Sequence, residues 1–357
     1  MRTGIADLPL HYGKTPAWLF QRMKELARYI TIYIISEQGQ EEMLKKLSDP
    51  FWFQAFGCVL GFDWHSSGLT TTVCGALKEG IKGIEQELGL FVAGGKGGTS
   101  RKTPQEIERV ANFLDKDPSP LIYASKMAAK VDSSALQDGF SLYHHCFIFS
   151  RNGLWTVIQQ GMNTNAHYAR RYHWLGKEVK DFVCEPHSAI CCDIRVKPLN
   201  MIALESQQAR ELTTELSREK PENIIKDIKK LQSLSLPAHH QVWLRDINPE
   251  RLNKIFLSTY EKQPQNFEAL LGTKGVGPKT IRALSLISEI IYGTAPSFLD
   301  PVRYSFAHGG KDGYPYPVDR KNYDLSIQIL KKAINNSKME RSEKIKALRR
   351  LYYFYAG

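Results

Sequence analysis

The sequence predicts an α+β protein, in which a mixed domain with an antiparallel hairpin precedes an all-helical domain. Two aromatic and β-branched runs, 140–149 and 154–160, flank Asn152-Gly153, and this pattern is the strongest short-range signal of a β-hairpin. From Leu204 onward the composition changes to Glu, Gln, Lys and Arg at helical spacing. We therefore expect an α+β domain over 1–204, a charged helical connector over 205–236 and a helical domain over 237–357.

Composition and charge restrict the class of protein. The length of 357 residues exceeds one typical domain, and 42% apolar residues suffice for buried cores. The 48 Lys and Arg residues exceed the 37 Asp and Glu residues, and the resulting net charge of +11 suits an anionic partner such as DNA. There is no run of about 20 apolar residues and no signal-peptide core at the N-terminus. We therefore expect a cytoplasmic protein with no membrane partner.

Apolar spacing predicts the elements around the hairpin. In the first domain we expect helices over 17–37, 38–47, 70–89 and 104–114, with an aromatic run at 51–58 beginning the core. The hairpin should place His144 and His145 on opposite faces of the sheet, because successive strand residues alternate. After Leu204 we expect a helix interrupted at Pro221, then helices from Pro249 and from about Tyr323.

The stretch 270–300 has the pattern of two helices that are joined by a glycine hairpin. Asn266 is a suitable cap for the first helix, and Gly272 can end it in the left-handed conformation. Pro278 suits the first position of a second helix that runs to about Tyr292. A helix start behind glycine-rich backbone binds anions, and we expect DNA phosphate there. The expected contacts are Lys274, Gly275, Val276, Gly277, Lys279, Thr280 and Arg282.

This Gly-Val-Gly-Pro-Lys-Thr segment resembles the helix-hairpin-helix motif, which binds the DNA backbone without reading sequence. The alternative is an ordinary capped helix pair that only contributes to the core. Two further basic segments are candidates for the same surface. The loop 94–104 offers Lys96, Arg101 and Lys102 but lacks Walker spacing, and it is otherwise a mobile basic loop. In 168–174, Arg170 and Arg171 alternate with aromatic rings, as in base-stacking surfaces or in a packed surface helix.

Four residues have partial metal-ligand spacing. Cys184, His187, Cys191 and Cys192 could fill a tetrahedral zinc site, but two adjacent cysteines coordinate one ion awkwardly, and no second half of a zinc motif follows. We therefore expect no metal and no other cofactor, with zinc at these four residues as the open alternative.

Over nearly its full length the chain resembles the domain-of-unknown-function 763 family, which consists mainly of archaeal and bacterial proteins without an established activity. The resemblance rests on GIADLPLHYGKTPAWLFQRM, GGKGGTSRKTP, QDGFSLYHHCFIF and the hairpin segment. The C-terminal part also resembles helix-hairpin-helix DNA glycosylases. That resemblance implies that Lys279 attacks the sugar carbon and that Asp300 assists it. The chain departs from the pattern in a slightly long interval to Asp300 and in lacking an iron-sulfur cysteine array.

We therefore expect a DNA-binding protein of DNA repair, with glycosylase or lyase action on damaged bases as its most specific form. One alternative is a metal-dependent DNA nuclease, which needs clustered carboxylates. Its candidates are Asp63, Asp138 and Glu185, or Asp300, His308, Asp312 and Asp319. The other alternative is a DNA-binding protein without catalysis.

Overall fold

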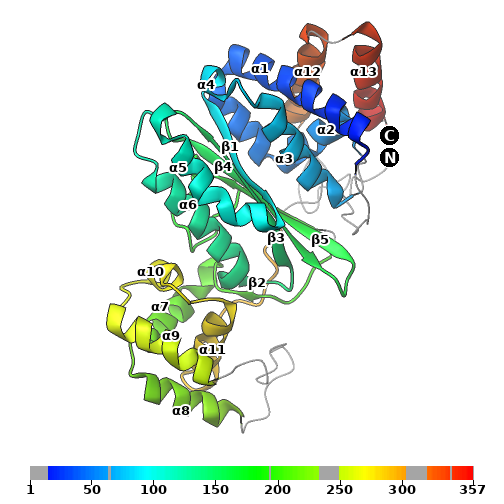
Figure 1. Cartoon of the computed structure of the whole chain (residues 1–357). Helices are drawn as coiled ribbons and strands as arrows, with labels where there is room; N and C mark the ends of the chain where they lie inside the picture. The colour runs from blue at the N-terminus through cyan, green and yellow to red at the C-terminus, as the bar shows by residue number, and fades with distance from the viewer. Residues whose placement is uncertain are drawn as a thin grey trace.

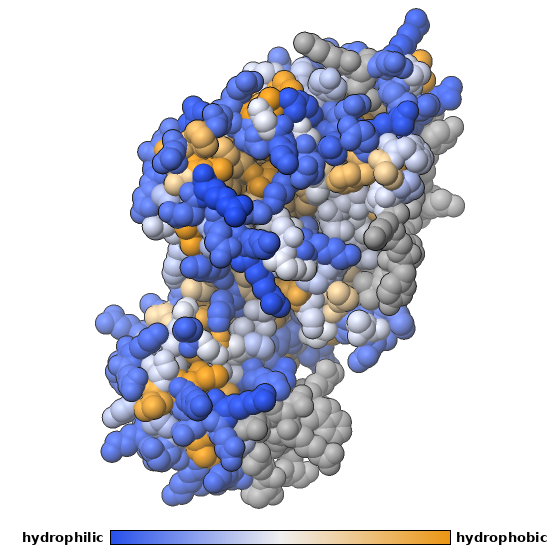
Figure 2. All heavy atoms as spheres, viewed as in Figure 1, coloured by the Kyte–Doolittle hydropathy of each residue, from blue (hydrophilic) through white to orange (hydrophobic). Residues whose placement is uncertain are grey.

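The computed structural model describes residues 15–62, 66–192, 194–232, 249–302, 320–337 and 340–356. A central antiparallel sheet has helices on both faces, and a further group of helices lies beyond one end of the sheet (Figure 1). The predicted α+β class is confirmed. Figure 2 shows hydrophilic residues over most of the visible face, with small hydrophobic patches between them.

Four helices form the first layer. They are α1 (Ala17–Ser48), α2 (Pro50–Leu60), α3 (Gly68–Ile81) and α4 (Glu85–Leu88). The two helices expected over 17–47 are the halves of α1, which is interrupted at Gly39, where φ is 83°. The Asp49 side chain caps α2 by accepting the Trp52 amide, and Pro50 occupies the first helical turn. The aromatic run at 51–58 is therefore helical, and α2 is buried over almost its whole length.

The sheet has five strands in the order β1-β3-β4-β5-β6, and every pair is antiparallel. Their bounds are β1 Leu90–Lys96, β3 Ser141–Ser150, β4 Trp155–Asn163, β5 Tyr168–Leu175 and β6 Ala189–Cys191. The predicted hairpin is β3 with β4, in which His144 lies opposite Gln160 and His145 opposite Gln159. Residues 168–175 form β5, not a surface helix. A second small sheet pairs β2 (Leu136–Gln137) with β7 (Leu199–Asn200).

The two faces of the sheet contribute to different cores. Phe147, Phe149 and Val157 pack with α5 (Thr103–Arg109) and α6 (Ser119–Lys130). On the other face, Cys146, Ile148 and Ile158 pack with α1, α2 and α3. The alternation expected for His144 and His145 thus puts their side chains on different sides of the sheet.

The helical group beyond the sheet contains α7 (Gln207–Ser217), α8 (Pro221–Gln232), α9 (Pro249–Lys262), α10 (Phe267–Gly272) and α11 (Pro278–Ile290). The break at Pro221 is as predicted. Helix α7 packs on α11 and α8 packs on α9, so residues 207–232 belong to the helical group. The predicted separate connector over 205–236 is therefore wrong in this part. The group shares its core with the α5–α6 face of the sheet.

The last two helices, α12 (Arg320–Asn336) and α13 (Arg341–Ala356), pack against α1 and α2. Ile329, Leu330, Ala333, Ile334 and Ala347 are buried in the same core as the first helices. The predicted domain over 237–357 is therefore wrong at its C-terminal end, because these helices return to the N-terminal layer (Figure 1). In the described part of the chain, no helix is both long and apolar enough to cross a membrane.

Candidate nucleic-acid interface

The hairpin between α10 and α11 has most of the predicted geometry. The Asn266 side chain accepts the Ala269 amide at 2.8 Å and caps α10. Gly272 is the last residue of α10, and the extended Thr273 follows it, so the left-handed conformation predicted for Gly272 is wrong. That conformation falls on Gly275, where φ is 93°. Pro278 begins α11 as expected.

The outer side of the turn is open and basic. Lys274 and Lys279 are exposed on either side of Gly275–Gly277. A Cβ atom added at Gly277 would meet no atom closer than 4.0 Å, and the residue has an extended φ of −150°. Since the first amides of a helix lack intrahelical partners, an anion can approach the start of α11 along this side.

The remaining predicted hairpin residues face the protein. Val276 and Thr280 are each 1% exposed. The Arg282 Nε–H donates to the Gln137 side-chain oxygen at 2.8 Å, so its guanidinium is engaged with β2. These three residues support the turn from inside the protein, and they do not lie on the open side where an anion would approach.

Two side chains of the sheet domain hold the hairpin in place. The Lys130 ammonium at the end of α6 donates to the Val276 carbonyl oxygen. The Gln137 amide donates to the Pro278 carbonyl oxygen at 2.9 Å. The hairpin is therefore fixed against α6 and β2, and it does not project alone from the helical group.

A cavity of about 650 Å³ lies beside the hairpin. Residues of the loop 97–103, of α6 and of β3 line it, together with Gly272 at the end of α10. Three of the lining residues are cations, namely Arg101, Lys126 and Lys130. The volume falls within the range of about 300–1,000 Å³ that is typical of ligand pockets.

The predicted basic loop borders this cavity. Lys96, Arg101 and Lys102 are exposed, and Arg101 is a lining residue. The Lys96 ammonium lies 5.8 Å from the ring centroid of Tyr143, which also lines the cavity. The structure thus brings the basic loop and Gly272 at the end of α10, which are far apart in sequence, to one cavity.

A chain of hydrogen bonds runs from the cavity into the interior. The Ser125 hydroxyl lies 2.9 Å from His145 Nε2, and His145 Nδ1 lies 2.8 Å from the Gln159 side-chain oxygen. Because a carbonyl oxygen only accepts, Nδ1 carries the proton and Nε2 accepts from Ser125. The Gln159 amide donates to Asp132. Burial lowers the pKa of His145 and favours the neutral ring that this arrangement requires.

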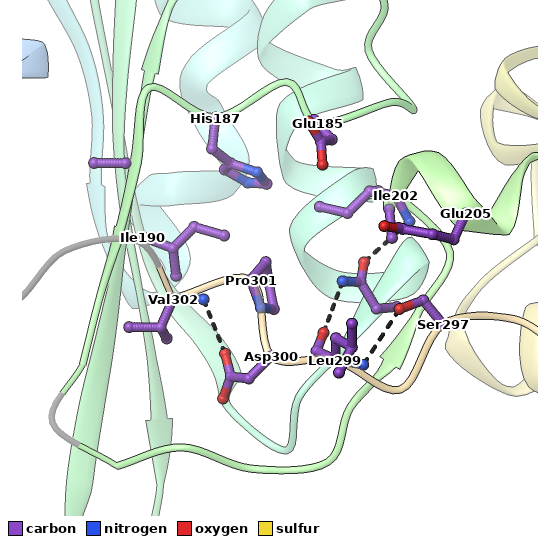
Figure 3. A pocket seen from close by; sticks show the side chains of 13 residues that line it. Glu185, His187, Ile190, Ile202, Glu205, Ser297, Leu299, Asp300, Pro301 and Val302 are labelled. Atoms are coloured by element: carbon purple, nitrogen blue, oxygen red, sulfur yellow. Dashed lines mark hydrogen bonds between the residues drawn. The ribbon is translucent and has the colours of Figure 1, made fainter. Parts of the chain in front are cut away.

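Asp132 connects the cavity to a second pocket. It lies in a π-helical turn, Val131–Ala135, and accepts from the Trp174 indole at 3.0 Å. Its other oxygen bonds His187 Nε2. His187 and Glu185 line the second pocket, which has a volume of about 200 Å³ (Figure 3). Isolated π-helical turns occur frequently at functional sites.

Asp300 lines this second pocket but is engaged in an ion pair. Its carboxylate bonds both terminal nitrogens of Arg170, at 3.1 and 2.8 Å, and accepts the Val196 and Val302 amides. Figure 3 shows Asp300 turned toward Val302. The residues that line the two pockets do not include Lys279, which is exposed at the start of α11. The structure therefore gives no support to the pairing of Lys279 with Asp300, and Lys279 as a nucleophile stays a prediction.

Arg170 and Arg171 are both fully buried, so their predicted role on a DNA-binding surface is wrong. Arg170 also bonds Asp138 at 3.1 Å. On the opposite face of the sheet, the Arg171 guanidinium donates to Gln54 at 2.9 Å. Buried arginines need such partners, and these partners occupy the groups that phosphate would use.

The residues of the alternative metal sites do not come together in the described part of the chain. Among the described residues, Cys184, His187, Cys191 and Cys192 do not form a cluster of metal ligands. No cluster of carboxylates that could hold a metal occurs in the same part of the chain. The nuclease candidates Asp63, His308, Asp312 and Asp319 lie outside the described residues.

A family model described as a protein of unknown function, DUF763, matches residues 4–318. The chain belongs to that family. No curated protein and no solved structure matches it. Membership in the DUF763 family thus carries no activity with it, and the function has to be argued from the site.

The sequence alone assigns no site role to three polar residues that line this cavity. Ser125, His145 and Gln159 belong to α6, β3 and β4, and no short motif connects them. In the sequence, Lys130 is only the last residue of a short stretch, 126–130, that contains two lysines. Here it lines the cavity, and burial lowers the pKa of its ammonium. The one feature of the sequence that indicates these residues is the presence of polar side chains within the otherwise apolar strands β3 and β4.

Proposed function

We propose that this protein binds the sugar-phosphate backbone of DNA across the hairpin 273–278 and the basic loop 96–102. The observation that carries the proposal is that one cavity is lined by Arg101 of the basic loop, by Gly272 directly before the hairpin, and by Lys130, which donates to the Val276 carbonyl oxygen of the hairpin. The hairpin offers backbone amides and lysine side chains to one phosphate group, and the basic loop offers lysine and arginine side chains to another.

The chemistry of the site favours backbone contacts over the reading of base sequence. The exposed groups are ammonium and guanidinium ions and the backbone at the start of α11. Such groups position a nucleic acid without specifying its sequence. The cavity between them has room for one nucleotide unit, and Tyr123 and Tyr143 offer aromatic rings to a base.

The test measures binding of a fluorescent duplex and of a single strand by anisotropy over a range of salt concentrations. Gly277→Leu should weaken binding to all sequences, because the residue has ordinary extended backbone and space for a side chain, but that side chain would block phosphate. Ser36→Leu on the exposed part of α1 is the matched control. Unchanged affinity of a folded Gly277→Leu protein would remove the proposal.

Variants that remove charge test the same contacts without adding a bulky side chain. The double variant Lys274→Gln with Lys279→Gln should lower the slope of log affinity against log salt by about 2, if each lysine meets one phosphate. The double variant Lys226→Gln with Lys229→Gln removes two charges from α8 and should leave the slope unchanged.

A glycosylase or lyase activity is the more specific form of this proposal, and the structure favours Lys130 as its amine. Lys130 lines the cavity and has a lowered pKa, as an amine nucleophile requires, whereas Lys279 is exposed and lines neither pocket. The amine would form a bond to the sugar carbon as the bond to the base breaks, and loss of a proton with ring opening would give an imine.

Borohydride trapping on DNA with damaged bases or abasic sites tests this chemistry. Lys130→Arg keeps a cation that can bond the Val276 carbonyl but forms no imine, so it should abolish trapping if Lys130 reacts. Lys279→Arg is the parallel variant. Trapping lost only in Lys279→Arg would assign the nucleophile to the hairpin, and EDTA-sensitive cleavage without trapping would favour the nuclease alternative.

A further inference from the structure

Three potential metal ligands meet on the side of β3 opposite to the His145 side chain. They are Cys74 on α3, and His144 and Cys146 on β3. Their ligand atoms all lie within 4.8 Å of one another. His144 and Cys146 are two residues apart in a strand, so their side chains share one face, and α3 brings the third ligand to them.

The cluster is closed to solvent, and its histidine is unsatisfied. Cys74, His144 and Cys146 are 2%, 2% and 1% exposed. Neither ring nitrogen of His144 has a hydrogen-bond partner, although both are buried. Buried polar side chains nearly always have partners, and an orphaned imidazole beside two thiols indicates a missing one.

The donor set identifies the class of partner. Two cysteine sulfurs and one imidazole nitrogen suit Zn²⁺ and related transition metals, whereas Mg²⁺ and Ca²⁺ require oxygen ligands. Two thiolates carry two negative charges, which balance a divalent cation in the apolar interior. The three protein ligands leave one tetrahedral position for water or another small ligand.

We propose that Cys74, His144 and Cys146 bind a zinc-class transition-metal ion that ties α3 to strand β3. The site is separate from the four residues of the 184–192 segment, whose His187 bonds Asp132. It lies across β3 from His145, so the ion would hold the strand that carries His145, the hydrogen-bond partner of Ser125. It rests on its own residues and does not depend on DNA binding.

Metal analysis of the full chain, purified under reducing conditions, tests the site directly. Elemental analysis should find about one zinc ion per chain. After removal of zinc by a chelator, added Co²⁺ should give the intense visible bands of tetrahedral cobalt and the near-ultraviolet band of thiolate-to-cobalt charge transfer. A fully reduced wild-type chain that binds neither ion would overturn the proposal.

Cysteine variants locate the ion. Cys74→Ser and Cys146→Ser should each lose the bound zinc and the charge-transfer band. Cys191→Ser, a buried cysteine outside the cluster, should keep both. Retention of zinc by the two cluster variants would overturn the proposal. So would a disulfide between Cys74 and Cys146, detected by mass spectrometry of the alkylated, non-reduced wild type, because that bond would consume both thiolates.

Discussion

Two neighbouring arginines of β5 occupy opposite interiors of the protein. Arg170 is directed toward the α5–α6 side and meets Asp138 and Asp300, whereas Arg171 meets the Gln54 oxygen on the other side. Both are fully buried. Cations that alternate with aromatic residues are typical of exposed surfaces, so sequence alone predicts the wrong location. Strand alternation sets the face on which each arginine lies, but residues on both faces of β5 are buried, and only the elements that cover the two faces reveal this.

We expect Asp300→Ala to lower the free energy of unfolding by about 3 kcal/mol, since breaking a buried ion pair costs about 3–5 kcal/mol and Arg170 keeps Asp138 as a second counterion. Urea titration followed by circular dichroism measures the change. The exposed Asp115→Ala is the control and should stay within about 0.5 kcal/mol. Undiminished stability of Asp300→Ala, together with lost activity, would return Asp300 to a catalytic role.

His173 should make the stability depend on pH. Burial, and then the charge of Arg171, lower its pKa well below the usual value. The unfolded chain takes up a proton below about pH 6.5 and the folded chain does not, so this contribution is complete above that pH and is lost as the pH falls. The loss from this one histidine is at most about 1.4 kcal/mol per pH unit.

His173→Gln should therefore reduce the slope of unfolding free energy against pH between about pH 6.5 and 5. The glutamine amide can still donate to the Leu47 carbonyl oxygen, which the histidine Nδ1 now contacts at 3.2 Å. Urea titrations at several pH values measure the slope. His167→Asn, at an exposed position, should leave it unchanged, and an equal slope in His173→Gln would contradict the buried neutral ring.

At the scale of elements, residues close in sequence correctly predicted helix ends and the β-hairpin. Contacts between distant elements could not be predicted in this way. The β3–β4 hairpin, the Asn266 cap, the start of α11 at Pro278 and the break at Pro221 all follow from residues within a few positions of the feature. The cavity beside the 273–278 hairpin, in contrast, forms only where α6, β3 and the loop 97–103 meet. Contacts between residues so distant in sequence depend on packing, which no local pattern specifies.

Lys130 is one of the two side chains that hold the 273–278 hairpin in place, and Lys126 provides a matched control for it. Lys130 donates to the Val276 carbonyl oxygen, whereas the exposed Lys126 lies one turn earlier on α6 and lines the same cavity. Lys130→Met should lower the local stability of residues 273–278 by about 1.5–3 kcal/mol, the usual contribution of a hydrogen bond to a charged group. Lys126→Met removes the same charge but should leave the hairpin unchanged.

Hydrogen–deuterium exchange of the hairpin amides measures this local opening. Both variants should also lower the salt slope of DNA binding by about 1 if each lysine meets a phosphate. Faster exchange in both variants, or in neither, would show that the Lys130 contact does not hold the hairpin.

At the scale of the whole molecule, helices that are adjacent in sequence do not always belong to the same hydrophobic core. The first core joins α1–α3 to α12 and α13, and the second joins the other sheet face to α7–α11. A change in composition at Leu204 indicates the start of a new helical region. The apolar face of an amphipathic helix, however, does not identify the surface against which it packs. The predicted C-terminal domain therefore included two helices that complete the N-terminal layer.

The assignment of α12 to the first core gives a test of this architecture. Leu330 is fully buried there, so Leu330→Ala should lower the free energy of unfolding by about 2–5 kcal/mol. The exposed Gln328→Ala on the same helix should change it by less than about 0.5 kcal/mol. Hydrogen–deuterium exchange should locate the lost protection in α1 and α2, because these helices pack against α12 and α13. Protection lost in α9–α11 instead would support a single helical domain over 237–357, since only then would α12 share a core with the hairpin.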